Sequence, residues 1–274
     1  TSGTGDVSAN TSRMVISTGA TSGSVANARS RYYLRYRPGF GALARFTMGI
    51  TKNVADSEQT GGVGNEEDGF FFSYRNNTMN IVRRYGGARE IRELTITTGS
   101  SSAGNVTITL DGAASAVAVS ANSGNANQTA TNIATNFSST LWSATARGNI
   151  VVFRALTASV KSGSFSFSAG ATGAVATLTQ KVVGVAASED VTPQASWNFD
   201  KANGSGTLPL IDWSLGNIFQ IKYQWLGYGM IQFYIEDPNL GRFIRVHAIK
   251  YANTSTTPTV NNPTFPFYFY ATNG

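Results

Sequence analysis

The chain has 274 residues, enough for one large domain or two small ones, and 41% of them are hydrophobic, which is enough to form a core. Charged residues make up only 13%, about half of the usual share. So few charges leave little to cover the outside of helices, and the many Thr, Val, Phe and Tyr residues favour strands. We therefore predict an all-β protein.

The composition also excludes several kinds of site. The chain has no cysteine and a single histidine, His247, which excludes a thiol nucleophile, a disulfide framework and a zinc site built from Cys and His. No run of eighteen apolar residues occurs and the first residues lack the features of a signal peptide, so we expect no membrane span. A start at Thr1 rather than Met suggests processing.

The net charge of +6 makes nucleic acid a candidate partner, but the arrangement of the arginines argues against it. Arginines between residues 29 and 37 alternate with tyrosine, serine and leucine, as on one face of a strand, and those between 83 and 92 are interleaved with glutamates. This pattern favours solvated strand faces or pairing between subunits. An anionic glycan is the next alternative, and nucleic acid is the least favoured.

The first 28 residues are mostly small or polar, and we expect an extended arm with at most one strand, at Met14–Ile16. Strand-like runs follow, separated by residues that tolerate tight turns. The glycine-rich run 60–64 is interpreted as one of these turns. The strands expected in this half lie over 31–37, 42–50, 69–74 and 79–84.

Residues 94–186 differ from their surroundings, because they contain only five charged residues and no proline. Asp111-Gly112 predicts a hairpin between two alternating strands. Apolar residues recur at helical spacing between 125 and 141 and predict a helix there. With two more strands after the helix, we expect an inserted ββαββ domain. Its strands are expected over 94–97 with 106–110, 116–119, 150–155 and 164–168.

After residue 186 the aromatic residues return, and five further strands are expected, over 196–199, 218–225, 230–236, 243–251 and 266–271. With the four earlier strands, they suffice for two antiparallel sheets. We therefore predict a jelly-roll-like antiparallel β-sandwich with an inserted small α+β domain. The expected parts are an arm at 1–28, half-sandwiches at 29–93 and 187–274, and the insert at 94–186.

Patterns typical of catalysis are weak. His247 lies in an alternating strand-like run, and no serine stands in a Gly-x-Ser-x-Gly motif. Acidic residues are grouped in turns, where they commonly make local hydrogen bonds. We predict that the protein is not an enzyme and has no cofactor and no metal. A loop calcium site, at residues 66–68 or at Asp200 with Asn203, stays open as an alternative.

Aromatic residues after position 196 are too numerous for a single core stripe, although core packing accounts for most of them. An exposed aromatic ledge commonly stacks against sugar rings or a partner subunit. The candidate glycan-binding or interface residues are Trp213, Trp225, Tyr228, Tyr234 and His247.

Three groups of short motifs carry a resemblance to a known class of protein. They are Tyr36-Arg37-Pro38-Gly39 with Ala44-Arg45-Phe46-Thr47; Asp68-Gly69-Phe70-Phe71-Phe72-Ser73-Tyr74; and Tyr223-Gln224-Trp225-Leu226-Gly227-Tyr228-Gly229 with Arg245-Val246-His247 and Tyr251-Ala252-Asn253. In this order they resemble virion structural proteins of tailed phages and large DNA viruses, of the fibre, spike or capsid-decoration type. The insert is similar to small β-rich modules of phage tail and fibre proteins.

The resemblance implies a non-enzymatic virion component that assembles as a homo-oligomer with other virion proteins and has a host surface glycan as a further contact. It assigns no catalytic or ligand residues. A cellular carbohydrate-binding module or adhesin is the alternative. We expect the arm at 1–28 to add a strand to the sheet edge of a neighbouring copy.

Overall fold

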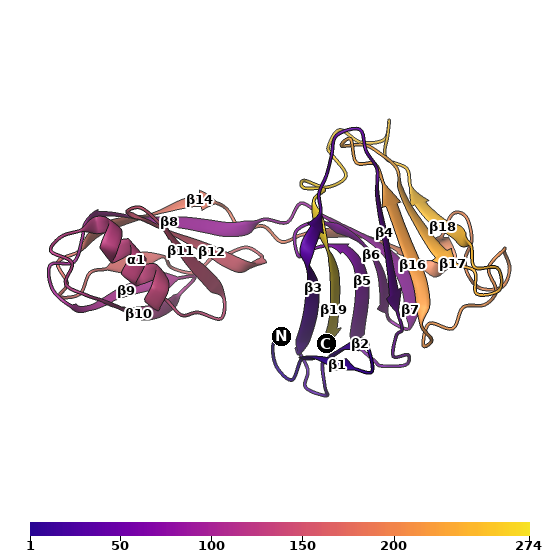
Figure 1. The fold of residues 1–274 in the computed structure, drawn as a ribbon, viewed down its shortest axis with the longest axis horizontal. Helices are drawn as coiled ribbons and strands as arrows, with labels where there is room; N and C mark the ends of the chain where they lie inside the picture. Colours follow the sequence, from indigo (N-terminus) through magenta and orange to yellow (C-terminus); the bar gives the residue numbers. More distant parts are fainter. The chain divides into compact units, whose positions relative to one another are not determined.

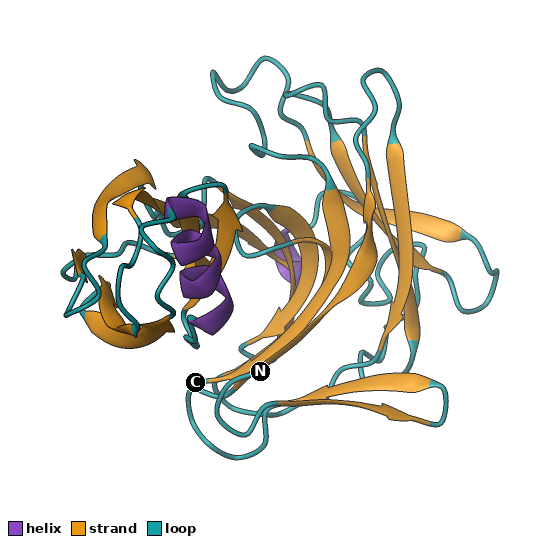
Figure 2. Cartoon of the chain, turned by 60° about the vertical axis from the view of Figure 1, so that its left-hand side comes forward, coloured by secondary structure: helices purple, strands orange, loops and turns teal.

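The computed structural model describes residues 1–274, which form two compact units (Figure 1). One unit, called the sandwich here, consists of Thr1–Tyr85 and Ser188–Gly274, and the other, the insert, is Gly86–Ala187. Nearly all of the regular structure is strand, with one α-helix in the insert (Figure 2). The predicted fold class, an all-β antiparallel sandwich with a small inserted α+β domain, is confirmed.

The sandwich unit is built from two large antiparallel sheets and a separate two-stranded hairpin. Its strands are β1 (Asp6–Asn10), β2 (Arg13–Ser17), β3 (Val25–Leu34), β4 (Ala42–Met48), β5 (Ser57–Gly64), β6 (Gly69–Arg75), β7 (Thr78–Tyr85), β15 (Ser188–Pro193), β16 (Asn217–Tyr223), β17 (Ile231–Glu236), β18 (Phe243–Ile249) and β19 (Phe265–Asn273). One sheet has the order β15-β7-β6-β5-β19-β3 and the other β18-β17-β16-β4. Strand β19 lies between β3 and β5, so the last strand closes the sheet that the third strand begins.

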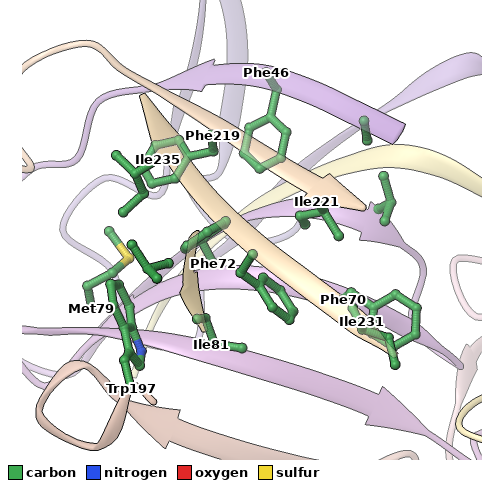
Figure 3. Packing of buried hydrophobic residues seen from close by; sticks show 14 of the residues in the cluster. Phe46, Phe70, Phe72, Met79, Ile81, Trp197, Phe219, Ile221, Ile231 and Ile235 are labelled. Atoms are coloured by element: carbon green, nitrogen blue, oxygen red, sulfur yellow. The ribbon is translucent and has the colours of Figure 1, made fainter. Parts of the chain in front are cut away.

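The core lies between these two sheets and is dominated by phenylalanine and isoleucine (Figure 3). Phe72 of β6 packs against Phe219 of β16 and Phe233 of β17, with ring centres 4.7 and 5.5 Å apart. These three side chains are fully buried. Burying one such side chain contributes about 1.5–3 kcal/mol, so this aromatic layer accounts for much of the stability of the sandwich.

Strand β5 shows that the turn expected at residues 60–64 is wrong. This segment pairs with β6 on one side and with β19 on the other, in the middle of the sheet. The space that side chains would fill is already occupied by the neighbouring strands: a Cβ atom on Gly61 would lie 2.8 Å from the Phe269 ring, and one on Gly62 would lie 2.2 Å from the carbonyl oxygen of Phe70 and 3.0 Å from the Phe71 ring. Glycine is therefore needed at these positions, because the neighbouring strands and their phenylalanine rings leave no room for a side chain.

The arm expected at 1–28 is also different in the structure. Strands β1 and β2 form a hairpin that pairs only with itself, and β3 already begins at Val25. Thr11 and Ser12, between the two strands, have positive φ angles of 49° and 62°. A two-residue turn of type I′ requires this backbone, and it folds the segment back on itself.

The strand expected over 196–199 is replaced by the 3-10 helix η1 (Gln194–Ser196) and a loop. Trp197 is turned into the core, where its Nε1 donates a hydrogen bond of 3.2 Å to the carbonyl oxygen of Thr192. The missed strand of this region is β15, which precedes η1 and pairs with β7.

The insert contains two small sheets and a helix. Its elements are β8 (Arg89–Thr98), β9 (Gly104–Leu110), β10 (Ala113–Val119), α1 (Ala126–Asn136), β11 (Trp142–Arg147), β12 (Ile150–Ala158), β13 (Ser166–Ser168) and β14 (Val175–Val182). The sheet orders are β10-β9-β13 and β11-β12-β8-β14. The insert has its own buried cluster, to which both sheets and the helix contribute. The expected ββαββ pattern included β9 over 106–110 but lacked β11 and β14.

Helix α1 is shorter than the predicted 125–141. The side chain of Asn125 accepts a hydrogen bond of 3.1 Å from the backbone N–H of Gln128 and caps the start. The helix ends because Phe137 takes an extended backbone, and its ring packs against Phe153 with centres 5.0 Å apart. Neither this helix nor η1 has the length and apolarity that crossing a membrane requires.

The insert interrupts the sandwich between β7 and β15. Its two ends connect to Tyr85 of β7 and Ser188 of β15, which are paired with each other. Within the insert, Ala88 and Val185 exchange two backbone hydrogen bonds of 3.0 and 2.8 Å close to this point. The boundary expected at residue 94 is therefore too late, because the charged residues of β8 already belong to the insert.

Candidate ligand-binding cleft and assembly surface

The structure does not bring the five candidate residues to one place. Trp213 is buried in the core, where its ring stacks on Phe219 at 6.3 Å. Tyr234 lies on β17, and its hydroxyl hydrogen-bonds to Gln232 of the same strand. Trp213 therefore serves the packing of the sandwich, whereas Tyr234 is half-buried and lies outside the core cluster.

His247 is held in place on β18 and is buried. Its Nδ1 accepts a hydrogen bond of 3.3 Å from the backbone N–H of Asn198. The Asn198 amide in turn exchanges two hydrogen bonds of 2.9 Å with the backbone of Ala248, as a neighbouring strand would. Burial lowers the pKa of His247, so the neutral form is favoured. These contacts support a structural role for the histidine.

Trp225 and Tyr228 lie close together in the loop between β16 and β17. The Tyr228 ring stacks on Tyr251 with centres 6.0 Å apart, and its hydroxyl donates to the carbonyl oxygen of Thr256. Trp225 Nε1 donates a hydrogen bond of 3.2 Å to the carbonyl oxygen of Val260. This loop and the loop after β18 therefore support each other at one end of the sandwich.

A cleft of about 210 Å³ opens at this end, and Trp225 lines it. Its lining also includes Arg35, Tyr36, Arg37 and Phe40, from the connection between β3 and β4. Tyr36 meets the Trp225 ring edge-on, with centres 5.1 Å apart and planes at 82°. Phe40 is 70% exposed, which is unusual for a large apolar side chain. We refer to these five residues as the arginine–aromatic cleft.

The walls of the arginine–aromatic cleft are fixed by a turn. The backbone N–H of Phe40 donates a hydrogen bond of 3.0 Å to the carbonyl oxygen of Arg37, and Gly39 has a φ of 82°. With Pro38 before the glycine, this is a type II turn. Gln224 Nε2 donates to the carbonyl oxygen of Gly39 at 3.0 Å and ties the turn to the opposite loop.

The arginine–aromatic cleft carries positive charge without a compensating acid. Arg35 and Arg37 are exposed and form no ion pair with an acidic side chain. No acidic residue occurs between Asp6 and Asp56, between Asp212 and Glu236, or after Asp237. Sequence reasoning interpreted these arginines as a strand face, whereas the long acid-free segments were the signal that could have pointed to an anion site.

A second hollow, the hairpin groove, lies between the β1–β2 hairpin and the sandwich, with a volume of about 690 Å³. Its hairpin side is formed by residues 12–16, including Met14, which is 50% exposed, and Val15. Its opposite side is formed by residues 47–51 and 269–271 together with Gln59, Ser214 and Gly216.

A cluster of charged and tyrosine side chains lies on the six-stranded sheet. Arg75 binds Glu58 at 2.6 Å and Glu189 at 3.0 Å, and Arg84 binds Glu189 at 2.7 Å and the Tyr270 hydroxyl at 2.7 Å. Burial alone would raise the pKa of Glu189, but the charges of Arg84 and Arg75 and their hydrogen bonds outweigh it and lower that pKa. Because the charges are paired, this cluster supports the sheet.

The two loops considered for calcium differ from an ion site. The carboxylate of Asp200 accepts backbone hydrogen bonds from Ala202, Thr207 and Leu208 at 2.6–3.0 Å. Asp68 accepts them from Asn261 and from the residue that follows it, at 3.2 and 3.4 Å. Both carboxylates therefore organise loops. No group of three or more histidine or acidic side chains is gathered as a metal site would need.

Comparison of the chain with known proteins finds no matching family model, no matching curated protein and no matching solved structure.

Proposed function

We propose that this protein is a non-enzymatic structural component of a virion, of the fibre, spike or capsid-decoration type, which assembles as a homo-oligomer and contacts a host surface glycan. The observation that carries the assembly part is the β1–β2 hairpin, which pairs with no strand of the sandwich. The motif resemblance described above supports the placement in a virion.

The hairpin supports assembly because each of its strands keeps one edge without a partner. Backbone N–H and C=O groups on such an edge readily pair with a strand of another chain. The exposed Met14 and Val15 lie on the same hairpin, next to the hairpin groove. Covering them with a second copy of this chain would remove apolar surface from water, which favours association.

The non-enzymatic part is supported by the state of the reactive groups. His247 is buried and held by Asn198, and no serine or carboxylate lies in hydrogen-bond contact with its ring. The charged cluster around Arg84 and Glu189 consists of paired groups. A general base needs a nucleophile or substrate proton within hydrogen-bond reach, and neither group offers this.

The assembly part is tested by sedimentation analysis of the full chain and of a variant, Met14→Arg, in which a charge replaces an exposed side chain of the hairpin. The wild type should sediment as an oligomer, and Met14→Arg should weaken self-association at least tenfold. Leu240→Arg is the matched control, because Leu240 is 61% exposed in the turn between β17 and β18, away from the hairpin groove. It should associate like the wild type.

The virion part is tested separately, by mass spectrometry of purified particles, in which the chain should be recovered in fixed proportion to the other virion proteins. A chain that is monomeric at all concentrations and absent from particles, but bound on a glycan array, would overturn the proposal in favour of a cellular carbohydrate-binding module or adhesin.

A further inference from the structure

We propose that the arginine–aromatic cleft binds a carboxylated sugar, with Arg35 and Arg37 holding the carboxylate and the aromatic side chains contacting the ring. The inference rests on the glycan contact of the proposed function and names the class of sugar. It is independent of the assembly through the hairpin.

The charge of the cleft selects an anion. Arg35 and Arg37 stand on either side of Tyr36 and both line the cleft. Neither has an acidic partner, and the segments that meet here carry no acidic residue. A guanidinium presents a planar pair of N–H donors that matches the two oxygens of a carboxylate. Two such groups at one small cleft favour a carboxylate over a neutral ligand.

The aromatic residues and the size of the cleft select a sugar ring as the carrier of that carboxylate. The exposed ring of Phe40 and the half-buried ring of Trp225 offer apolar faces of the kind that sugars pack against. The volume of about 210 Å³ is below the ~300 Å³ at which pockets for drug-sized ligands begin, so it accommodates a single ring.

The same features argue against a nucleic-acid strand. Proteins that bind single strands combine a basic groove along the backbone with several aromatic side chains, each stacking on a successive base. Here the cleft offers one indole ring: Trp225 is half-buried, Tyr36 meets it edge-on, and its Nε1 is fixed by a hydrogen bond to the carbonyl oxygen of Val260. The cleft itself therefore offers a position for one ring, and the exposed Tyr32 and Tyr33 of β3 lie outside its lining.

The cleft is also organised before any ligand arrives. The type II turn at Pro38 and Gly39 is tied to Gln224, and Tyr36 N–H donates a hydrogen bond of 3.2 Å to the side chain of Thr264. Little ordering of the backbone is then needed on binding, which favours measurable affinity for a small ligand.

The test is a ligand-observed NMR titration of the full chain with methyl β-D-glucuronide and methyl β-D-glucoside, which differ only in the carboxylate. The glucuronide should bind with a Kd of about 1 mM, and the glucoside at least tenfold more weakly. Arg35→Gln and Arg37→Gln should each weaken glucuronide binding at least tenfold. Arg29→Gln, the same charge change on β3 outside the cleft, should leave it unchanged. All three side chains are exposed, so the thermal unfolding of the variants serves as the check of their fold.

The other outcomes separate the explanations. Equal binding of both sugars would overturn the proposal that the ligand is a carboxylated sugar, while the proposed glycan contact would still hold. Binding of neither sugar would overturn both proposals, but it would not bear on the proposed assembly. Binding of acetate as tight as that of the glucuronide would show that the cleft recognises only the carboxylate, and it would overturn the sugar ring as part of the ligand. Tighter binding of a thymidine dinucleotide, lost in Arg35→Gln, would assign the cleft to nucleic acid.

Discussion

Replacing Gly62 of β5 with alanine should destabilise the sandwich more than the same replacement of its neighbour Gly61. A Cβ atom on Gly62 would lie 2.2 Å from the carbonyl oxygen of Phe70 and 2.8 Å from the Cα of Phe71, both backbone atoms of β6. A Cβ atom on Gly61 would meet only side chains, the sulfur of Met48 and the ring of Phe269, each at 2.8 Å. The methyl group of Gly62→Ala would therefore clash with the backbone of β6, whereas that of Gly61→Ala would clash only with side chains that can move.

The distances give the magnitudes. To reach 3.0 Å, the shortest contact that Cβ atoms normally make, β5 and β6 must separate by about 0.8 Å at Gly62, which lengthens the hydrogen bonds between them. At Gly61 a side-chain shift of about 0.2 Å is enough. Overpacking of a core costs about 1–3 kcal/mol, so we expect about 3 kcal/mol for Gly62→Ala and about 1 kcal/mol for Gly61→Ala.

The free energy of unfolding should be measured by urea titration with tryptophan fluorescence. Trp197, Trp213 and Trp225 report on the sandwich, and Trp142 reports on the insert. A Trp142→Phe background removes the signal of the insert, and it loses no hydrogen bond because the buried Nε1 of Trp142 has no partner. Equal losses for the two glycines, or a larger loss at Gly61, would refute the assignment of β5 as a strand whose backbone is packed too closely for a side chain.

Three further changes test other parts of the structure. Asn198→Ala should lower the unfolding free energy by about 1–3 kcal/mol in urea titration, because it leaves the buried backbone groups of Ala248 unpaired, and Asn198→Asp should recover part of the loss at Ala248 N–H. Replacing residues 86–187 with a two-residue Asn-Gly turn should leave a folded sandwich with dispersed NMR signals, because Tyr85 and Ser188 are already paired; a collapsed spectrum would contradict the insertion point. The pKa of Glu189 is lowered from its ordinary value of 4.5, so its ionised carboxylate stabilises the folded protein above pH 4.5. This stabilisation is lost as the pH falls through the pKa of Glu189 in the folded protein. Glu189→Gln should therefore be less stable than wild type at pH 7, and its unfolding free energy should fall less steeply with acid in unfolding curves.

The strands that the sequence predicted well are those whose own residues carry the pattern. Strands β6, β7, β16 and β17 alternate or repeat large apolar side chains and were placed within a residue or two. Strand β5 was missed because glycine is typical of turns. The need for glycine inside this strand follows only from the close packing of the neighbouring strands and their phenylalanines. Edge strands such as β15, with few large apolar residues, also carry no strong pattern of their own.

The candidate site was less accessible to sequence reasoning. Trp225 was identified among the aromatic residues, but its partners in the cleft come from a loop almost two hundred residues earlier. Trp213 and Tyr234 belong to the same aromatic-rich part of the sequence as Trp225. Only the packing shows that Trp213 lies inside the core. Contact between distant loops is a property of the sheet topology, which single-residue patterns do not contain.

The pairing of β19 with β3 determines the order in which the chain can fold as it is synthesised. Thr272 pairs with Val25, so the six-stranded sheet cannot be completed until the ribosome has made the chain as far as β19. The insert draws all its strands from residues 86–187 and can fold while the second half of the sandwich is still missing. Contacts this distant in sequence form slowly, and in the meantime β3 and β5 expose their unpaired edges. Loss of the last nine residues of the sheet, by premature termination or proteolysis, would therefore expose those edges permanently and favour aggregation, even though it removes no part of the arginine–aromatic cleft.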